Sequence, residues 1–241
     1  MLYFITALSL LFFGIGFLIT KSNAKYTLAG YNTMTPDQQA MVDIKSLVKI
    51  HRFFHIFLSI SYLAVGCILI LQFGSIHGGI FLVVYPILAY IAYLGYLSKH
   101  SIKQNKSTYY LVILVLLIVL FSISAMFFYT LKENQIIHSS DAIEITGMYG
   151  EIIALNDIKS VRLIPHAPTI KRRAGGFAMG AVKKGDFKIQ SGEKAKLFLN
   201  DQNEGKIIEI VLINGTKIYY STASGNTEYQ LQKFPAKLVI N

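Results

Sequence analysis

Four long apolar runs constrain the fold more than any other feature of this sequence. They cover residues 2–20, 53–73, 79–97 and 109–131, and His55 is the one acidic or basic side chain within them. A helix rises about 1.5 Å per residue, so about 20 apolar residues cross the roughly 30 Å hydrocarbon core of a bilayer. In lipid the backbone must satisfy its own hydrogen bonds, which favours helices. Residues 1–131 are therefore predicted to form a domain of four transmembrane helices, and not the buried core of a soluble protein.

The composition and the single cysteine narrow the class of protein. Hydrophobic residues make up 53% of the chain and charged residues 15%, against about 25% charged in an average soluble protein. These values are untypical of a soluble enzyme, a disordered chain or a nucleic-acid-binding domain. Cys67 alone cannot form an intrachain disulfide or a cysteine-cluster metal site. Because no catalytic triad can be assembled and the His51/His55 pair lacks an identifiable third ligand, we expect no enzyme, no cofactor and no metal.

The loop charges predict an orientation in the membrane. The segment 21–52 has five basic and two acidic residues, the segment 98–108 has three lysines and no acid, and the segment 73–78 is uncharged. The positive-inside rule places the two basic segments in the cytoplasm. With four spans, the N-terminus and the tail after Leu131 lie outside the cytoplasm. Two alternatives stay open. Cleavage near Ser22-Asn23-Ala24 would remove the first run as a signal peptide, and loss of one span would bring the tail into the cytoplasm.

The cytoplasmic segment 21–52 carries a helix-start motif. Thr35-Pro36-Asp37-Gln38 has the form of a capping box, with proline in the first turn. Apolar residues then recur at helical spacing, which predicts one amphipathic helix from about residue 36 into the second span. Its basic residues could bind anionic headgroups or could simply orient the chain. The residues expected at the membrane interface are Tyr31, Asn32, Lys45, Lys49 and Arg52.

A short string before this helix carries a family resemblance. The string is Ala29-Gly30-Tyr31-Asn32-Thr33-Met34, and it stands between a short apolar helix and a polar helix that keeps Asp43 and Lys45. In this arrangement the chain resembles a family of small bacterial membrane proteins of unknown function, over roughly residues 1–98. The resemblance implies a bacterial integral membrane protein and no defined activity. With four predicted spans, we expect a multi-pass protein of the cytoplasmic membrane.

The tail, residues 132–241, has a different composition and a strand-like pattern. Short alternating segments are separated by turn signals such as Ser191-Gly192 and Asn214-Gly215. Asn-Gly between two apolar segments is a strong hairpin signal. The predicted strands are 142–146, 151–155, 159–164, 186–189, 195–199, 206–213 and 217–221, followed by a helix over 227–234. This order predicts an all-β small barrel or sandwich closed by a C-terminal helix.

The tail is also similar to bacterial pleckstrin-homology-like domains. The similarity rests on Met148–Ile152, Leu155–Val161, Gly176–Phe187 and Glu193–Leu199, with an Asp-Ile-x-Ser-Val element and a later Lys-Gly-x-Phe element. It implies a binding or scaffolding module. A candidate ligand patch, expected in a loop before a glycine-rich stretch, consists of Lys171, Arg172, Arg173, Lys183 and Lys184. Arginine binds phosphate bidentately, so an anionic ligand fits this patch, and a solvated loop fits it too.

Two functions follow from these observations. The first is a membrane-anchored binding or scaffolding protein, whose partners are the lipid bilayer, a protein or a second copy of the chain, and an anionic ligand, but not nucleic acid. The second is a small transporter or an accessory subunit of a membrane enzyme, in which Pro86 kinks the third span beside a cavity. The scarcity of charged groups within the spans disfavours the second function.

Overall fold

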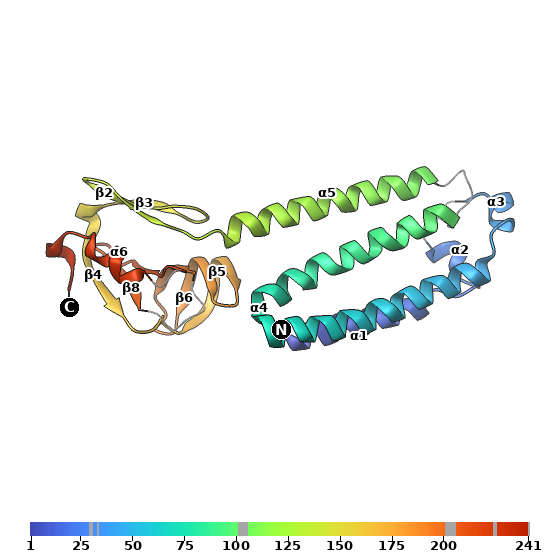
Figure 1. Ribbon diagram of the computed structural model, residues 1–241, viewed down its shortest axis with the longest axis horizontal. Coiled ribbons are helices and arrows are strands. Elements are labelled where there is room, and N and C mark those ends of the chain that lie inside the picture. Colours follow the sequence, from blue (N-terminus) through green and yellow to red (C-terminus); the bar gives the residue numbers. More distant parts are fainter. Residues whose placement is uncertain (29–30, 33, 101–105, 201–205, 224–225, 241) are drawn as a thin grey trace. The chain divides into compact units, whose positions relative to one another are not determined.

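The computed structural model describes residues 1–28, 31–32, 34–100, 106–200, 206–223 and 226–240 (Figure 1). Gly30, for which the sequence suggests a turn with Asn32, lies outside these residues. The chain divides into two compact units, Met1–Ser124 and Ala125–Asn241. We call the first the helical unit and the second the sheet unit.

All four apolar runs are helical. The helical unit contains α1 (Leu2–Leu18), α2 (Ala24–Thr27), α3 (Pro36–Ala40), α4 (Ile44–His100) and the greater part of α5 (Lys106–Leu131). Within α4, Gly74 has φ +81° and separates two antiparallel legs, residues 44–73 and 75–100 (Figure 1). Two of the described helices, Ile44–Lys99 and Lys106–Leu131, are long and apolar enough to cross a membrane, and α1 is shorter.

The turn between the two legs is tighter than the sequence predicted. We expected a loop over residues 73–78, but only Gly74 leaves the helical conformation. Glycine adopts a positive φ at little cost, so one residue can reverse the chain. A side chain at Gly78 would overlap Ile70 Cγ1, so the legs also need a glycine there to approach each other.

The predicted amphipathic helix is interrupted. The capping box is confirmed: Thr35 N–H donates to Gln38 Oε1 at 3.0 Å and Gln38 N–H donates to Thr35 Oγ1 at 3.4 Å. However, α3 ends at Ala40 and α4 begins at Ile44. The Asp43 carboxylate accepts hydrogen bonds from the backbone N–H groups of Lys45 and Ser46. An aspartate at this position stabilises a new helix start, and this is why the single predicted helix becomes two.

Small residues bring α1 against the first leg of α4. Ser9 Oγ donates to the Ser59 carbonyl at 2.8 Å, and both side chains are buried. A Cβ at Gly16 would lie 3.0 Å from His55 Cβ. Ile5, which packs at Gly66, is fully buried. Small residues and interhelical hydrogen bonds are typical of helix contacts in membranes.

Pro86 does not break the helix. The second leg stays helical through Pro86, although proline cannot donate to the carbonyl four residues before it. That carbonyl belongs to Leu82, and it accepts a hydrogen bond from the hydroxyl of the fully buried Tyr62 at 3.1 Å. A side chain of the first leg thus replaces the missing backbone donor.

The sheet unit contains two sheets. The first has the order β1 (Ile136–His138), β2 (Ala142–Ile145), β3 (Glu151–Ala154). The second has the order β4-β8-β9-β7-β6-β5, with bounds Ile158–Ile164, Ile207–Leu212, Lys217–Tyr220, Lys194–Leu199, Val182–Ile189 and Ile170–Met179. Helix α6 (Thr227–Gln232) follows. A mostly-sheet unit with a C-terminal helix is confirmed.

The pairing of the strands fits the sandwich and not the small barrel, the two forms that the sequence left open. Among the described residues the second sheet is open, with β4 and β5 at its edges. Strand β7 pairs in parallel with β9. The chain passes from β7 to β8 on the other side of β9, and the Asn214-Gly215 turn then brings it back into β9, between β8 and β7. Ile143, Ile153, Phe198 and Ile210 share one core drawn from both sheets, which is the packing of a sandwich.

Strand β5 was missing from the sequence prediction. Its charges and glycines indicated a loop, yet residues 170–179 pair with β6. A side chain at Gly176 would overlap the Lys184 carbonyl, so the glycine allows β5 and β6 to approach each other closely. β1 was also not predicted, since three residues are too short to show an alternating pattern.

Candidate functional site

Basic side chains gather around one hollow at an end of the helical unit. The hollow has a volume of about 470 Å³ and we call it the basic hollow. It is lined by residues from the turn after α1 and from the first turns of α4, namely Thr20, Lys21, Ser22, Lys45, Val48, Lys49 and Arg52. Three of the residues expected at the membrane interface, Lys45, Lys49 and Arg52, thus belong to one site.

A local turn after α1 brings Lys21 and Ser22 to this site. Asn23 Oδ1 accepts a hydrogen bond from Thr20 N–H at 2.7 Å, and Asn23 Nδ2 donates to the Leu18 carbonyl at 2.8 Å. The side chain therefore satisfies backbone groups that the end of α1 leaves open. Val48 of α4 packs in an apolar cluster with residues of the same turn, Ile19, Ala24 and Leu28. This cluster fixes the turn against α4.

Helical spacing sets the remaining cations side by side. At about 100° per residue, positions 45, 49 and 52 lie on one face of a helix. The Arg52 guanidinium lies 4.9 Å from the centre of the Phe17 ring, a cation–π contact. Arg52 Nε is buried and has no hydrogen-bond partner among the described residues.

No acidic side chain lines the basic hollow. Asp37 and Asp43 are the only acids in residues 1–131, and Asp43 caps the start of α4. The ion pairs found among the described residues all join groups of the sheet unit. The four cations of the hollow therefore present a concentrated positive charge that the described protein groups do not neutralise.

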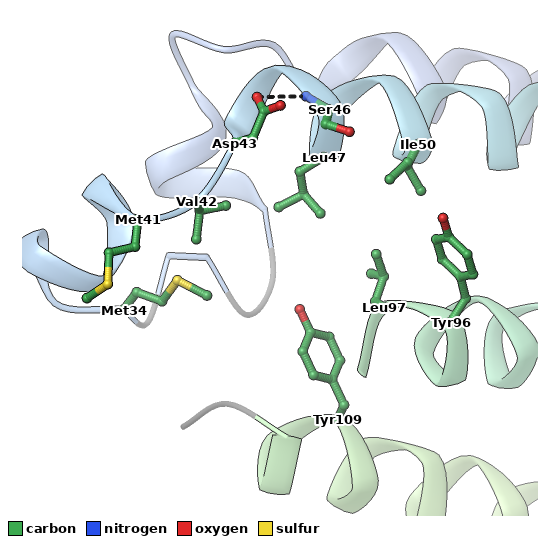
Figure 2. A pocket seen from close by; sticks show the side chains of 10 residues that line it. All are labelled: Met34, Met41, Val42, Asp43, Ser46, Leu47, Ile50, Tyr96, Leu97 and Tyr109. Carbon is green, nitrogen blue, oxygen red and sulfur yellow. Dashed lines mark hydrogen bonds between the residues drawn. The ribbon is translucent and has the colours of Figure 1, made fainter. Parts of the chain in front are cut away.

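Two further hollows adjoin the same stretch of α4. The first, of about 300 Å³, is mainly apolar (Figure 2). Met34 and Met41 enter it from the connection around α3, Leu47 and Ile50 from the first leg, and Tyr109 from the start of α5. The second, of about 640 Å³, we call the aromatic groove. It is lined by Ser46, Lys49, Ile50, Phe53, Phe54, Phe57, Tyr93 and Tyr96.

A buried polar cluster joins the two legs of α4 next to the aromatic groove. His55 Nε2 lies 2.9 Å from the Tyr90 hydroxyl, and His51 Nδ1 lies 3.2 Å from the Tyr93 hydroxyl. Phe54 stacks on Tyr93 with the ring centres 4.1 Å apart. The two histidines thus have tyrosine partners that hold the legs together. Among the described residues no group of three His, Cys, Asp or Glu side chains is placed to hold a metal ion.

The other two predicted interface residues lie apart from the basic hollow. Tyr31 packs against the apolar cluster of Ile19, Ala24, Leu28 and Val48, and its carbonyl accepts a hydrogen bond from Gln39 Nε2 at 3.0 Å. Asn32 is exposed. Their expected place at a membrane surface stays a prediction.

We expected the five cations of the candidate ligand patch to lie together in a loop. Instead they belong to strands β5 and β6. Lys171, Arg172 and Arg173 are exposed residues of β5, at the edge of the second sheet. Arg172 pairs with Lys188, whereas Lys183 pairs with Ala178 farther along the hairpin. At about 3.3 Å per residue these two positions are roughly 20 Å apart along the strands. Charges on an edge strand also discourage pairing with another sheet, which is a second role for the Lys171–Arg173 row.

Lys184 is not available to a ligand at all. Its side chain is fully buried, and its ammonium group donates to the Lys132 carbonyl at the end of α5. Burial lowers the pKa of Lys184 to about 8, partly opposed by the nearby Glu133 carboxylate. Burial also lowers the pKa of Lys183, whose ammonium group donates to the Gly180 carbonyl. The sequence did not reveal this burial, because a Lys-Lys pair beside a turn is usually exposed to solvent.

The comparisons with known proteins concern the helical unit. Residues 6–101 match the model of a family described as “Domain of unknown function (DUF3784)”. This stretch includes most of α1 and all of α4, with Lys21, Lys45, Lys49 and Arg52. It is consistent with the expected N-terminal membrane-protein domain of unknown function. Neither the curated proteins nor the solved structures contain a match to the chain. The pleckstrin-homology-like assignment of the tail stays a prediction.

Proposed function

We propose that this chain is a multi-pass membrane protein of the bacterial cytoplasmic membrane that carries the sheet unit as a binding module. The observation behind the proposal is the surface of α5. This helix is apolar all round, yet Phe121 is 76% exposed and Phe128 is 80% exposed. A helix in a soluble protein has one apolar stripe, and a helix apolar on all sides needs a core or a bilayer around it. Removing a large apolar side chain from water is favourable by about 1.5–3 kcal/mol. A bilayer around α5 would provide this burial for its exposed side chains.

The arrangement of the helical unit supports four spans. α1 packs antiparallel to the first leg of α4, which suits a retained helix better than a cleaved signal peptide. The end of α1, the start of α4 and the start of α5 lie at the same end of this unit, and the turn between the two legs of α4 lies at the other (Figure 1). The basic segments therefore share one face. By the positive-inside rule this face is cytoplasmic, and the sheet unit is extracytoplasmic.

The binding role of the sheet unit rests on its resemblance to pleckstrin-homology-like domains and on the Lys171–Arg173 row. The row is exposed and lies on an edge strand, where a protein partner or an anionic ligand has access to it. Of the two predicted forms, a small barrel and a sandwich, the open sheet with its parallel β7–β9 pair fits the sandwich. The proposal therefore depends on the row and not on a barrel.

The alternative, a small transporter or an accessory subunit of a membrane enzyme, has less support. Its expected sign is a polar cavity between the spans beside Pro86. The three hollows described above lie near the basic end of the helical unit, and the two histidines between the legs have tyrosine partners. This pattern favours a packed helical anchor.

A pair of C-terminal fusions tests the membrane topology. Alkaline phosphatase is active outside the cytoplasm, and a fluorescent protein folds inside it. We expect phosphatase activity without fluorescence. Fluorescence without phosphatase activity would contradict an extracytoplasmic sheet unit and would remove one span. Release of the chain from membranes by alkaline carbonate would contradict membrane integration itself.

A charge-matched pair of variants tests the role of the row. The full chain in neutral detergent is eluted with salt from heparin resin, a generic polyanion. We expect Lys171→Ala/Arg172→Ala/Arg173→Ala to elute at clearly lower salt than a control triple with the same charge change. The control removes three scattered exposed lysines of the same unit, Lys159, Lys194 and Lys237. Equal elution of the two triples would remove the row from the proposal.

A further inference from the structure

We propose that the basic hollow and the aromatic groove together form a binding site for one anionic phospholipid. The basic hollow holds the phosphate headgroup, and the aromatic groove holds part of an acyl chain. This inference rests on the proposed membrane function, because it needs the helical unit to lie in a bilayer. It concerns the helical unit, and no resemblance or family match assigns a ligand to that unit.

The headgroup half of the site has the chemistry that a phosphate needs. Lys21, Lys45 and Lys49 offer ammonium groups, Arg52 offers a guanidinium group, and the hydroxyls of Thr20 and Ser22 add hydrogen-bond donors. Charge-assisted hydrogen bonds from such groups to phosphate are stronger than neutral ones. Since no acidic side chain lines the hollow, a bound anion has no competitor within it.

The Arg52 side chain also lacks an anionic partner. Its guanidinium stacks over Phe17, and its Nε is buried without a partner. None of the ion pairs found among the described residues includes Arg52, so a phosphate in the hollow would supply a counter-charge for its guanidinium. Phosphate oxygens can accept from both Arg52 and the neighbouring lysines.

The acyl-chain half begins at Lys49, which lines both hollows. On a helix with about 100° between residues, positions 46, 50, 53 and 57 form the face next to that of 45, 49 and 52. Phe53 and Phe57 on this face are exposed large apolar side chains. One helix thus presents a cationic face and an aromatic face side by side. This is the pattern of an amphiphile with an anionic head.

The charge of the basic hollow and the apolar lining of the aromatic groove favour an anionic phospholipid over other occupants. A soluble phosphate would satisfy only the basic hollow and would leave the aromatic groove open. A neutral lipid would fill the groove and leave four cations without counter-charge. An anionic phospholipid serves both halves, and each lysine near a membrane surface adds to its attraction.

Native mass spectrometry of the full chain tests this site. The chain is purified in neutral detergent and mixed with equal amounts of phosphatidylglycerol and phosphatidylcholine of the same chain length. We expect the wild type to retain phosphatidylglycerol at least about tenfold over phosphatidylcholine. Lys21→Gln/Lys45→Gln/Lys49→Gln should bring this ratio to within about twofold of unity. These three lysines are exposed, so the variant removes charge without disturbing the packed interior.

Two further variants make the outcome specific. The matched control changes Lys25, Lys99 and Lys106 to Gln, which removes three lysines of the helical unit that do not line the basic hollow. It should keep the wild-type ratio within about twofold. The conservative triple Lys21→Arg/Lys45→Arg/Lys49→Arg should also keep it. An equal loss in the control and the test triple would overturn the proposal, because general positive charge would then explain the retention.

Two further experiments distinguish a lipid phosphate from a soluble phosphate, and this inference from the proposed membrane function. If glycerol phosphate displaced the lipid at concentrations comparable to those of phosphatidylglycerol, the site would be one for soluble phosphate, and the lipid proposal would fail. Carbonate extraction of the wild type reports on membrane integration independently. Retention in carbonate-washed membranes with no lipid preference would refute this inference alone.

Discussion

The hydrogen bond between Tyr62 and the helix at Pro86 can be tested by a double-mutant cycle. Pro86 removes the donor for the Leu82 carbonyl, and the Tyr62 hydroxyl takes its place at 3.1 Å. In the Tyr62→Phe variant this carbonyl loses its side-chain donor. In the Pro86→Ala variant the backbone N–H of residue 86 returns and can bond to Leu82. The cost of losing the hydroxyl should therefore depend on which residue stands at 86.

The magnitudes follow from the contacts. Interhelical hydrogen bonds in membrane proteins average about 0.6 kcal/mol and reach about 1.7 kcal/mol. Tyr62 is fully buried, so we expect the upper half of that range, about 1 kcal/mol, for Tyr62→Phe. Restoring the backbone bond should make Pro86→Ala neutral or stabilising, by up to about 3 kcal/mol. In the Pro86→Ala background, Tyr62→Phe should cost less than about 0.3 kcal/mol, which is the usual error of additivity.

The assay is unfolding of the full chain by SDS in mixed micelles. Because the chain has no tryptophan, the helical circular dichroism signal serves as the readout. The control is Tyr85→Phe in both backgrounds, since Tyr85 donates to Ser61 Oγ and not to the Leu82 carbonyl. Its cost should be the same whether residue 86 is Pro or Ala. An equal cost of Tyr62→Phe in the two backgrounds would refute the idea that the hydroxyl compensates for the proline.

Two predictions concern the sheet unit. Burial lowers the pKa of Lys184 from its ordinary value of 10.5 to about 8. Between these values the unfolded chain binds more protons, so Lys184 should make stability rise with pH by at most about 3 kcal/mol. Lys184→Met should reduce the rise measured in urea titrations at pH 7.5 and 10, and the smaller contribution of Lys183 should remain. Arg162→Met should cost about 2 kcal/mol, because the Glu209 side chain is only 5% exposed and would lose a charged hydrogen-bond donor. Lys206→Met should cost less than about 1 kcal/mol in the same titrations, since the side chain of its partner Glu228 is 58% exposed. Equal costs for the two ion-pair variants, or an unchanged pH dependence in Lys184→Met, would contradict the role assigned to burial.

Local signals predicted much of the helical unit. Uninterrupted apolar runs become helices because no other conformation satisfies the backbone without water. The Thr35–Gln38 capping box and the Asn214-Gly215 turn were also predicted, because each depends on side chains and backbone groups only a few residues apart. The Asp43 cap was not predicted, because the apolar spacing around it favoured one continuous helix.

Features that join distant residues could not be predicted in this way. The Lys171–Arg173 segment was expected in a loop, because its pairing with residues 187–188 depends on a hairpin partner and not on local composition. From the sequence Lys184 was expected in solvent, but in the structure its ammonium group donates to the Lys132 carbonyl at the end of α5. The parallel β7–β9 pair likewise arises from the return of β8, which no local pattern marks.

The basic hollow shows the division most clearly. By itself the sequence determined that Lys45, Lys49 and Arg52 share one helix face, since this follows from the helical repeat. Only the tertiary structure decided that Lys21 and Ser22 join them and that the aromatic groove adjoins them. The reason is physical: Gly16 and Ser9 let α1 approach α4 closely, and the Asn23 turn then fixes the end of α1 beside the cations.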